Sequence, residues 1–176
     1  MSERPCGQRL VAWAPSISDP IFRPMCGRVR LSSDVSEIKR VFSIPPHRPT
    51  PNFAPSWNAA PTDQLPIVRF DKRAGERSLD LARWGLVPYW AKDIKVGFAN
   101  INAKAEGIEN RPAFRDAFQR RRCLVPVDNF YEWKKTATGK QPNAIALAER
   151  GLMAVQRRGD RFGAVGLAQK RVNLVY

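Results

Sequence analysis

Residues 123–134 read Cys123-Leu-Val-Pro-Val-Asp-Asn-Phe-Tyr-Glu-Trp-Lys134, a pattern typical of a β-strand. Residues 141–148 form a second such pattern, and Thr138-Gly139 predicts the turn of a hairpin between them. Working outward, we expect further strands at 26–31, 66–70 and 79–83. Strands therefore outnumber helices and are joined locally, which predicts an α+β domain made mainly of antiparallel sheets.

Two helices are expected beside these strands. The first begins at Ser33 or Asp34, because Glu37 follows Asp34 in a capping-box position. The second begins near Pro112, a residue favoured in the first helical turn. The apolar positions that we expect these helices to bury are Val35, Ile38, Val41 and Phe42 in the first and Phe114 and Phe118 in the second.

The composition restricts the class of partner. The 176 residues include 30 Lys or Arg against 16 Asp or Glu, a formal charge of +14, and the length suits one domain. Such an excess favours a polyanion, with nucleic acid ahead of an anionic membrane surface. No apolar run approaches the roughly 20 residues of a membrane span, and the first 30 residues lack a signal-peptide pattern. We therefore expect a cytoplasmic protein without a membrane partner.

The chain has three cysteines and one histidine. Three cysteines without a C-x-x-C pair cannot close a disulfide framework, and a single histidine at position 47 gives no metal-ligand spacing. We expect His47 to be exposed to solvent. The sequence thus predicts no metal and no cofactor.

Cys26 follows Met25 and precedes a glycine. If translation began at Met25, removal of that methionine would leave Cys26 with a free α-amine, whose pKa of about 7.7–8.0 keeps part of it neutral at pH 7. A neutral amine attacks an aldehyde to give an imine, and the neighbouring thiol can then close a five-membered thiazolidine. The alternative is a small buried cysteine at the start of a strand.

Two other clusters could carry chemistry. Burial beside Phe130 would raise the pKa of Glu132 towards that of a general acid or base, although an exposed Glu132 paired with Lys134 is an equal alternative. In the segment 100–104, Asn102 could hold a substrate oxygen and Lys104 could meet a phosphate, or the two asparagines could simply form a turn.

Three aromatic residues follow the expected strand at 79–83, and they could stack on unpaired bases or belong to the core. They are Trp84, Tyr89 and Trp90.

Six motifs occur in the same order in a known family. They are Met25-Cys-Gly-Arg28, Trp57-Asn-Ala-Ala-Pro-Thr62, Trp84-Gly-Leu-Val-Pro-Tyr-Trp90, Ile101-Asn-Ala-Lys104, Arg111-Pro-Ala-Phe-Arg115 and the strand at 123–134. Through them, residues 25–153 resemble the SOS response-associated peptidase (SRAP) family, the HMCES/YedK-like abasic-site processing proteins. The resemblance implies a barrel-like arrangement of the antiparallel sheets with flanking helices, and a monomer that acts on single-stranded DNA.

The resemblance also implies roles for individual residues. Cys26, as a new N-terminus, would crosslink to the ring-opened aldehyde of an abasic site. Asn102 would position the deoxyribose, and Glu132 would transfer protons and take part in the autoproteolytic exposure of Cys26. The DNA groove would be lined by Arg28, Asn58, Pro61, Trp90, Lys104 and Arg111. Lys104 stands where the family usually has arginine, so it would meet phosphate without a bidentate fork.

The chain departs from the family pattern at both ends. Residues 1–24 show no periodicity, and we interpret them as a mis-assigned start or a pro-segment. The family's later histidine motif is missing, and His47 lies too far upstream to replace it. Residues 154–176 are Arg-rich, show no obvious amphipathic element and do not match, so we expect the C-terminal part of the domain to be lost by truncation or frameshift.

The resemblance therefore implies a Cys-dependent peptidase of the DNA damage (SOS) response. Its expected activity is a covalent, thiazolidine crosslink to abasic sites in single-stranded DNA. The alternatives are a protein that binds single strands without chemistry and an inactive truncated fragment.

Overall fold

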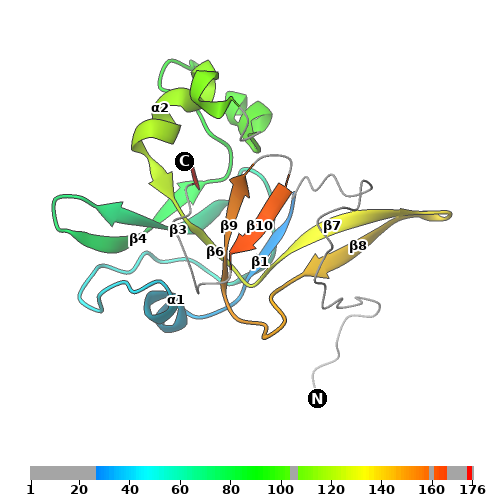
Figure 1. Ribbon diagram of the computed structural model, residues 1–176, viewed down its shortest axis with the longest axis horizontal. Coiled ribbons are helices and arrows are strands. Elements are labelled where there is room, and N and C mark those ends of the chain that lie inside the picture. Colours follow the sequence, from blue (N-terminus) through cyan, green and yellow to red (C-terminus); the bar gives the residue numbers. More distant parts are fainter. Residues whose placement is uncertain (1–26, 104–106, 159–160, 166–173, 176) are drawn as a thin grey trace.

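The computed structural model describes residues 27–103, 107–158, 161–165 and 174–175. This part of the chain consists mainly of strands, with one α-helix after the first strand and another before the fifth strand (Figure 1). In chain order the elements are β1 (Val29–Leu31), α1 (Val35–Val41), β2 (Ser56–Ala59), β3 (Gln64–Asp71), β4 (Glu76–Arg83), the 3₁₀ helices η1 (Ile94–Asn100) and η2 (Ile108–Asn110), α2 (Pro112–Arg120), β5 (Arg122–Cys123), β6 (Val125–Val127), β7 (Asn129–Thr136), β8 (Gly139–Ile145), β9 (Met153–Arg158), β10 (Arg161–Val165) and β11 (Leu174–Val175).

The strands of the described segments form four sheets. One has the order β2-β1-β7-β8, a second has β10-β9-β6, and two are pairs, β11-β5 and β3-β4. All these pairs are antiparallel, which confirms the predicted α+β class. The barrel-like arrangement is wrong, because the sheets do not close on one another. The β3–β4 pair, for example, meets the β5–β6 region through the isolated bridge between Val68 and Leu124.

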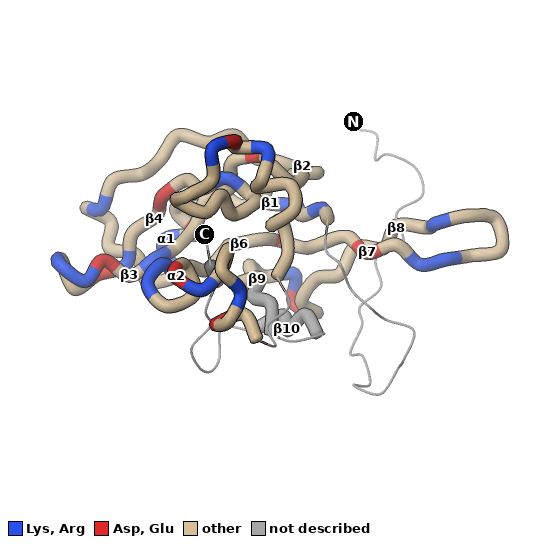
Figure 2. Tube along the Cα trace, turned by 90° about the horizontal axis from the view of Figure 1, so that it is seen from above, with Lys and Arg blue, Asp and Glu red and all other residues tan. Residues whose placement is uncertain are grey.

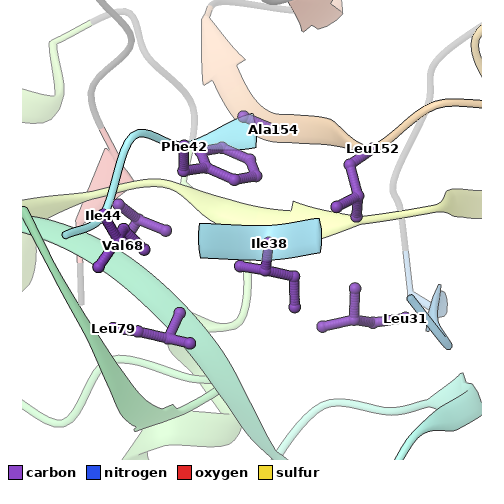
Figure 3. Close-up of a cluster of buried hydrophobic side chains, with 8 residues drawn as sticks. All are labelled: Leu31, Ile38, Phe42, Ile44, Val68, Leu79, Leu152 and Ala154. Atoms are coloured by element: carbon purple, nitrogen blue, oxygen red, sulfur yellow. The ribbon is translucent and has the colours of Figure 1, made fainter. Parts of the chain in front are cut away.

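The first helix begins where the sequence predicts. The Asp34 side chain caps α1 by accepting a hydrogen bond from the Glu37 amide at 2.8 Å. Ile38 and Phe42 from this segment are fully buried. Figure 3 shows them in one cluster with residues from four strands and two loops. The members of this cluster are Leu31, Ile38, Phe42, Ile44, Val68, Leu79, Leu152 and Ala154.

The core extends past residue 153, the expected end of the matched domain. Leu152, Met153 and Ala154 are all buried, and β9 pairs with β6 through Val155 and Val125. Regular structure continues beyond Ala154, because β9 runs to Arg158 and pairs with β10. The expected division of the chain at residue 153 stays a prediction.

Two hairpins extend from opposite ends of the molecule. The β3–β4 hairpin lies at one end and the β7–β8 hairpin at the other in both perpendicular views (Figures 1 and 2). The β7–β8 turn lies at 136–139, as predicted from Thr138-Gly139. None of the helices in the described ranges has the length and apolar character needed to cross a bilayer.

Candidate active site

Glu132 is the most perturbed carboxylate of the described chain. It lies in β7, the strand between β1 and β8 (Figure 1), and only 7% of the residue is exposed. Burial raises the pKa of Glu132 to about 7, although a hydrogen bond from the Trp133 amide opposes this shift. Its Oε1 is buried and has no hydrogen-bond partner among the described residues. At neutral pH this group can therefore both give and accept a proton. The alternative of an exposed Glu132 paired with Lys134 is wrong.

The start of β1 lies beside this carboxylate. Val29 pairs with Phe130, and the Tyr131 amide donates to the Arg28 carbonyl at 2.9 Å. Glu132 is the residue after Tyr131, and Gly27 is the residue before Arg28. Cys26 lies outside the described residues, but it is joined directly to Gly27. The chain that leads to Cys26 thus enters next to Glu132.

The motif at 57–62 is held against the same sheet. Ala59 of β2 pairs with Val29, and the Tyr131 hydroxyl donates to the Trp57 carbonyl at 3.0 Å. The Asn58 side chain is left exposed on this strand. Pro61 follows in a turn, which places both residues of the motif at the rim of the four-stranded sheet.

Backbone and side-chain hydrogen bonds join that turn to the Asn102 segment. The Thr62 amide donates to the Trp84 carbonyl at 2.8 Å, and Trp84 Nε1 donates to the Ile101 carbonyl at 3.0 Å. Asn102 follows directly, and its half-buried side chain has partners of its own. Trp84 therefore joins Thr62, the residue after Pro61, to Ile101, the residue before Asn102.

The aromatic residues divide into two groups. Trp84 is half-buried against the core cluster around Val127, which favours the alternative that it belongs to the core. Tyr89 and Trp90, by contrast, are 83% and 55% exposed. Their rings are available to a flat apolar ligand such as an unpaired base.

Arg111 and Lys104 are the two remaining positions of the expected DNA groove. Arg111 stands at the N-terminal end of α2, exposed, with its guanidinium 5.7 Å from the centre of the Phe114 ring. Lys104 lies outside the described residues. The roles assigned to both stay predictions.

Sequence reasoning gave no role to Trp57, although its motif was recognised. The Arg30 guanidinium lies 3.8 Å from the centre of the Trp57 ring, and 62% of Trp57 is exposed. Its position directly before Asn58 in the motif at 57–62 was the available signal. His47 is exposed as expected and lies 3.0 Å from Glu76.

No group of three or more His, Cys, Asp or Glu side chains within the described ranges could hold a metal ion.

The family model described as "SOS response associated peptidase (SRAP)" matches residues 25–157. The chain belongs to the SRAP family. The matched range includes every residue of the candidate site, from the segment before β1 to β7. The match ends at residue 157, four residues beyond residue 153, where the resemblance of the motifs ends. This agrees with the pairing of β9.

Several curated proteins are similar to this SRAP-family chain. It is 39% identical over 131 residues to the abasic site processing protein YoqW of Bacillus subtilis, covering 74% of this chain and 58% of that protein. It is 29% identical over 140 residues to the abasic site processing protein HMCES of Gallus gallus, covering 69% and 42%. The chain thus spans little more than half the length of YoqW and less of HMCES.

Solved structures support the fold. A protein from Bordetella bronchiseptica has a TM-score of 0.60 and 21% identity, with 74% of this chain and 61% of that chain covered. A protein from Bacteroides thetaiotaomicron has a TM-score of 0.59 and 20% identity, with coverage of 74% and 58%. At this identity the likeness establishes the SRAP fold alone.

Proposed function

We propose that this protein processes abasic sites in single-stranded DNA by a covalent crosslink through Cys26. One observation carries the proposal. A buried carboxylate with a pKa of about 7, Glu132, directly follows Tyr131, whose amide donates to the Arg28 carbonyl two residues from Cys26. Membership of the SRAP family and the names of the curated relatives support abasic-site processing as the overall task.

The chemistry requires that Cys26 be the first residue. Hydrolysis of the bond between Met25 and Cys26 consumes one water and releases the α-amine, an autoproteolytic step in which Glu132 is the proton carrier. The amine then adds to the aldehyde of the ring-opened deoxyribose, and loss of water gives an imine. The thiol adds across the C=N bond, with sulfur on carbon and the proton on nitrogen, which closes the thiazolidine.

Glu132 also serves the two later steps, imine formation and ring closure, that move protons. Its protonated form donates to the oxygen that leaves as water, and its ionised form accepts the proton of the thiol. Because its pKa is about 7, both forms are present at neutral pH. Asn102 is the residue that holds the sugar, since Trp84 fixes the preceding residue, Ile101, by a hydrogen bond.

The DNA strand is held by the residues around this centre. Arg28 and Arg111 supply charge for phosphates, and Trp90 supplies an exposed ring for a base. Asn58 and Pro61 complete the groove on the β2 side, and Lys104 adds a further phosphate contact. The partner is single-stranded DNA, and the setting is the DNA damage response of a cytoplasmic monomer.

The test uses protein in which Cys26 is the first residue. It is incubated with a single-stranded oligonucleotide that carries one abasic site, and a heat-stable shifted band is expected on a denaturing gel. Cys26→Ala should abolish the band, and Glu132→Gln should slow its formation at pH 7. Persistence of the band with Cys26→Ala would overturn the proposal. An intact strand bound as tightly as an abasic strand, without crosslinking, would favour simple single-strand binding instead.

A further inference from the structure

A strongly basic cleft of about 670 Å³ lies between the β3–β4 hairpin and the end of α2. Its cationic side chains come from three segments that are far apart in sequence. Arg48 comes from the loop before β2, Arg69, Lys72 and Arg73 come from β3 and its turn, and arginines occupy all of positions 120–122. Glu132 is not among the lining residues, so the cleft is separate from the candidate active site.

Carboxylates neutralise only part of this charge. Arg48 lies 2.8 Å from Asp71, and Arg69 lies 2.7 Å from Asp80. The hydrogen bond from Arg48 is the main cause that holds the pKa of Asp71 below its ordinary value, so this carboxylate stays ionised. The third acid is Asp116, which lies outside the lining and faces the arginines at 120 and 121. The seven cationic side chains of the lining therefore exceed all three carboxylates by four.

Two guanidinium donors in the cleft lack acceptors. Arg48 Nε and Arg121 Nε are buried and form no hydrogen bond with the described residues. A buried donor without a partner is unfavourable, so a ligand that brings acceptor oxygens is favoured here. Arginine in particular matches the geometry of a phosphate with two parallel N–H groups. The chemistry of the cleft therefore suits phosphate groups.

The turn at the end of the β3–β4 hairpin presents two of the cations on a fixed backbone. Asp71 Oδ1 accepts hydrogen bonds from the amides of Arg73 and Ala74 at 3.0 and 3.3 Å, and the Gly75 amide donates to the Asp71 carbonyl at 2.9 Å. These bonds leave the side chains of Lys72 and Arg73 exposed. Figure 2 shows Lys and Arg positions at this tip and along α2.

We propose that this cleft is a second nucleic-acid-binding site, which holds the phosphodiester backbone of a DNA strand away from the reactive centre. Phe70, which is 59% exposed, lines the same cleft and offers a ring to a base. Arginines together with an exposed ring favour a nucleic acid over an anionic lipid surface. The site requires no chemistry at Cys26, so it goes beyond the proposed crosslinking function.

The test measures the affinity of the full chain for an intact 30-nucleotide single strand by fluorescence anisotropy at several salt concentrations. Lys72→Ala/Arg73→Ala removes two exposed cations, while the turn is still held by backbone amides. The matched control is Lys135→Ala/Lys140→Ala, which removes the same charge from the exposed, distal part of the β7–β8 hairpin. Each lost phosphate contact lowers the slope of log K against log [salt] by about 0.7 for single strands.

The first variant should therefore lose about 1.4 from the slope and about tenfold in affinity near 0.15 M salt, and the control should change less. Equal losses in both variants would overturn the proposal, because net charge alone would then explain the binding. A loss of binding to phosphatidylserine vesicles with unchanged DNA affinity would also overturn it. The crosslink yield at saturating abasic DNA should stay unchanged in the first variant, and Cys26→Ala should keep its affinity for intact DNA, which separates this site from the proposed reaction.

Discussion

Gly85 and Gly97 lie so close together that a Cβ on Gly85 would stand 2.7 Å from the Gly97 carbonyl oxygen. Gly85 also has φ +125°, in the range that side chains rarely adopt. Hydrogen bonds between Leu86 and Asn100 continue this contact, since the Leu86 amide donates at 3.3 Å and Asn100 Nδ2 donates back at 3.0 Å. The loop that carries Trp90 is thereby fastened to η1, which leads directly into Asn102.

Gly85→Ala should therefore destabilise the protein and weaken DNA binding together. We expect a loss of about 3 kcal/mol or more in the free energy of unfolding, because the clash is with backbone and cannot be relieved by a side-chain rotation. Gly75→Ala is the matched control, since Gly75 has φ +70° but open space around it. It should cost about 1–2 kcal/mol, from the left-handed backbone alone. Urea denaturation measures the free energy of unfolding of both variants. Equal losses in the two would contradict the close-contact argument.

The burial of Glu132 makes stability depend on pH. Its folded pKa of about 7 lies above the ordinary value of 4.5, so the folded state holds the proton more tightly. The favourable contribution is complete below about pH 4.5 and is lost as the pH rises through 7. Since one unit corresponds to 1.36 kcal/mol, this loss is about 3 kcal/mol by pH 8.

Glu132→Gln should remove this dependence. The variant should be more stable than the parent at pH 8, and the difference should shrink towards pH 5. The control is Glu109→Gln, which changes an exposed carboxylate. Thermal unfolding across this pH range measures the effect, and parallel curves for parent and Glu132→Gln would contradict the buried carboxylate.

Cys123 should be unreactive in the folded protein. Only 4% of the residue is exposed, and burial raises the pKa of its thiol to about 12, against a smaller opposite effect of Arg69. At pH 8 the thiolate, which is the reactive form, is then about one part in ten thousand. Iodoacetamide followed by peptide mass spectrometry should find Cys123 unmodified in native protein and modified in 6 M guanidinium. Rapid alkylation without denaturant would show that β5 does not bury this residue.

Asp128 connects the end of β1 to the start of β7. Its carboxylate accepts hydrogen bonds from the Ser32 amide at 2.6 Å and from the Ser32 and Ser33 hydroxyls at 2.8 and 2.6 Å. Burial alone would raise the pKa of Asp128, but these bonds and the Arg30 charge outweigh burial and lower it. The stability that this carboxylate provides is therefore present above about pH 4 and is lost as the pH falls through its lowered pKa.

Asp128→Asn should cost about 2 kcal/mol at pH 7, because three hydrogen bonds lose a charged acceptor. Asp63→Asn is a suitable control, since Asp63 accepts one exposed hydrogen bond from Ala60 and should cost less than about 1 kcal/mol. Denaturant unfolding at pH 7 and pH 3 measures both variants. A cost for Asp128→Asn that stays the same at pH 3 would contradict the ionised carboxylate.

The local elements followed from the sequence because their signals are local. The Asp34 cap, the proline at the start of α2 and the hairpin at 138–139 depend on residues a few positions apart, and the structure places all three as predicted. The barrel-like arrangement could not be obtained in this way. Closure depends on hydrogen bonds between strands distant in the chain, and Val68 and Leu124 supply only an isolated bridge between two of the sheets.

In the candidate site, too, some features follow from the sequence and others depend on contacts between distant strands. Its residues and the chemical character of Glu132 could be named from the sequence, since the motif fixes which side chains are present. The burial of Glu132 and the contact between Trp57 and Arg30 depended on packing between β1, β2 and β7. The hydrogen bond from Trp84 to Ile101 likewise depended on tertiary structure.

The sequence by itself determined the family, both α-helices, several of the strands and the set of groups available for chemistry, because each depends on residue types and short spacings. The tertiary structure alone decided which of those groups lose contact with water. Desolvation depends on every neighbour that folding brings together, and it raises the pKa of Glu132 to about 7 while leaving Tyr89 and Trp90 exposed. The same assembly of distant segments gathered the arginines at 48 and 120–122 beside Lys72, a basic cleft that no single stretch of sequence reveals.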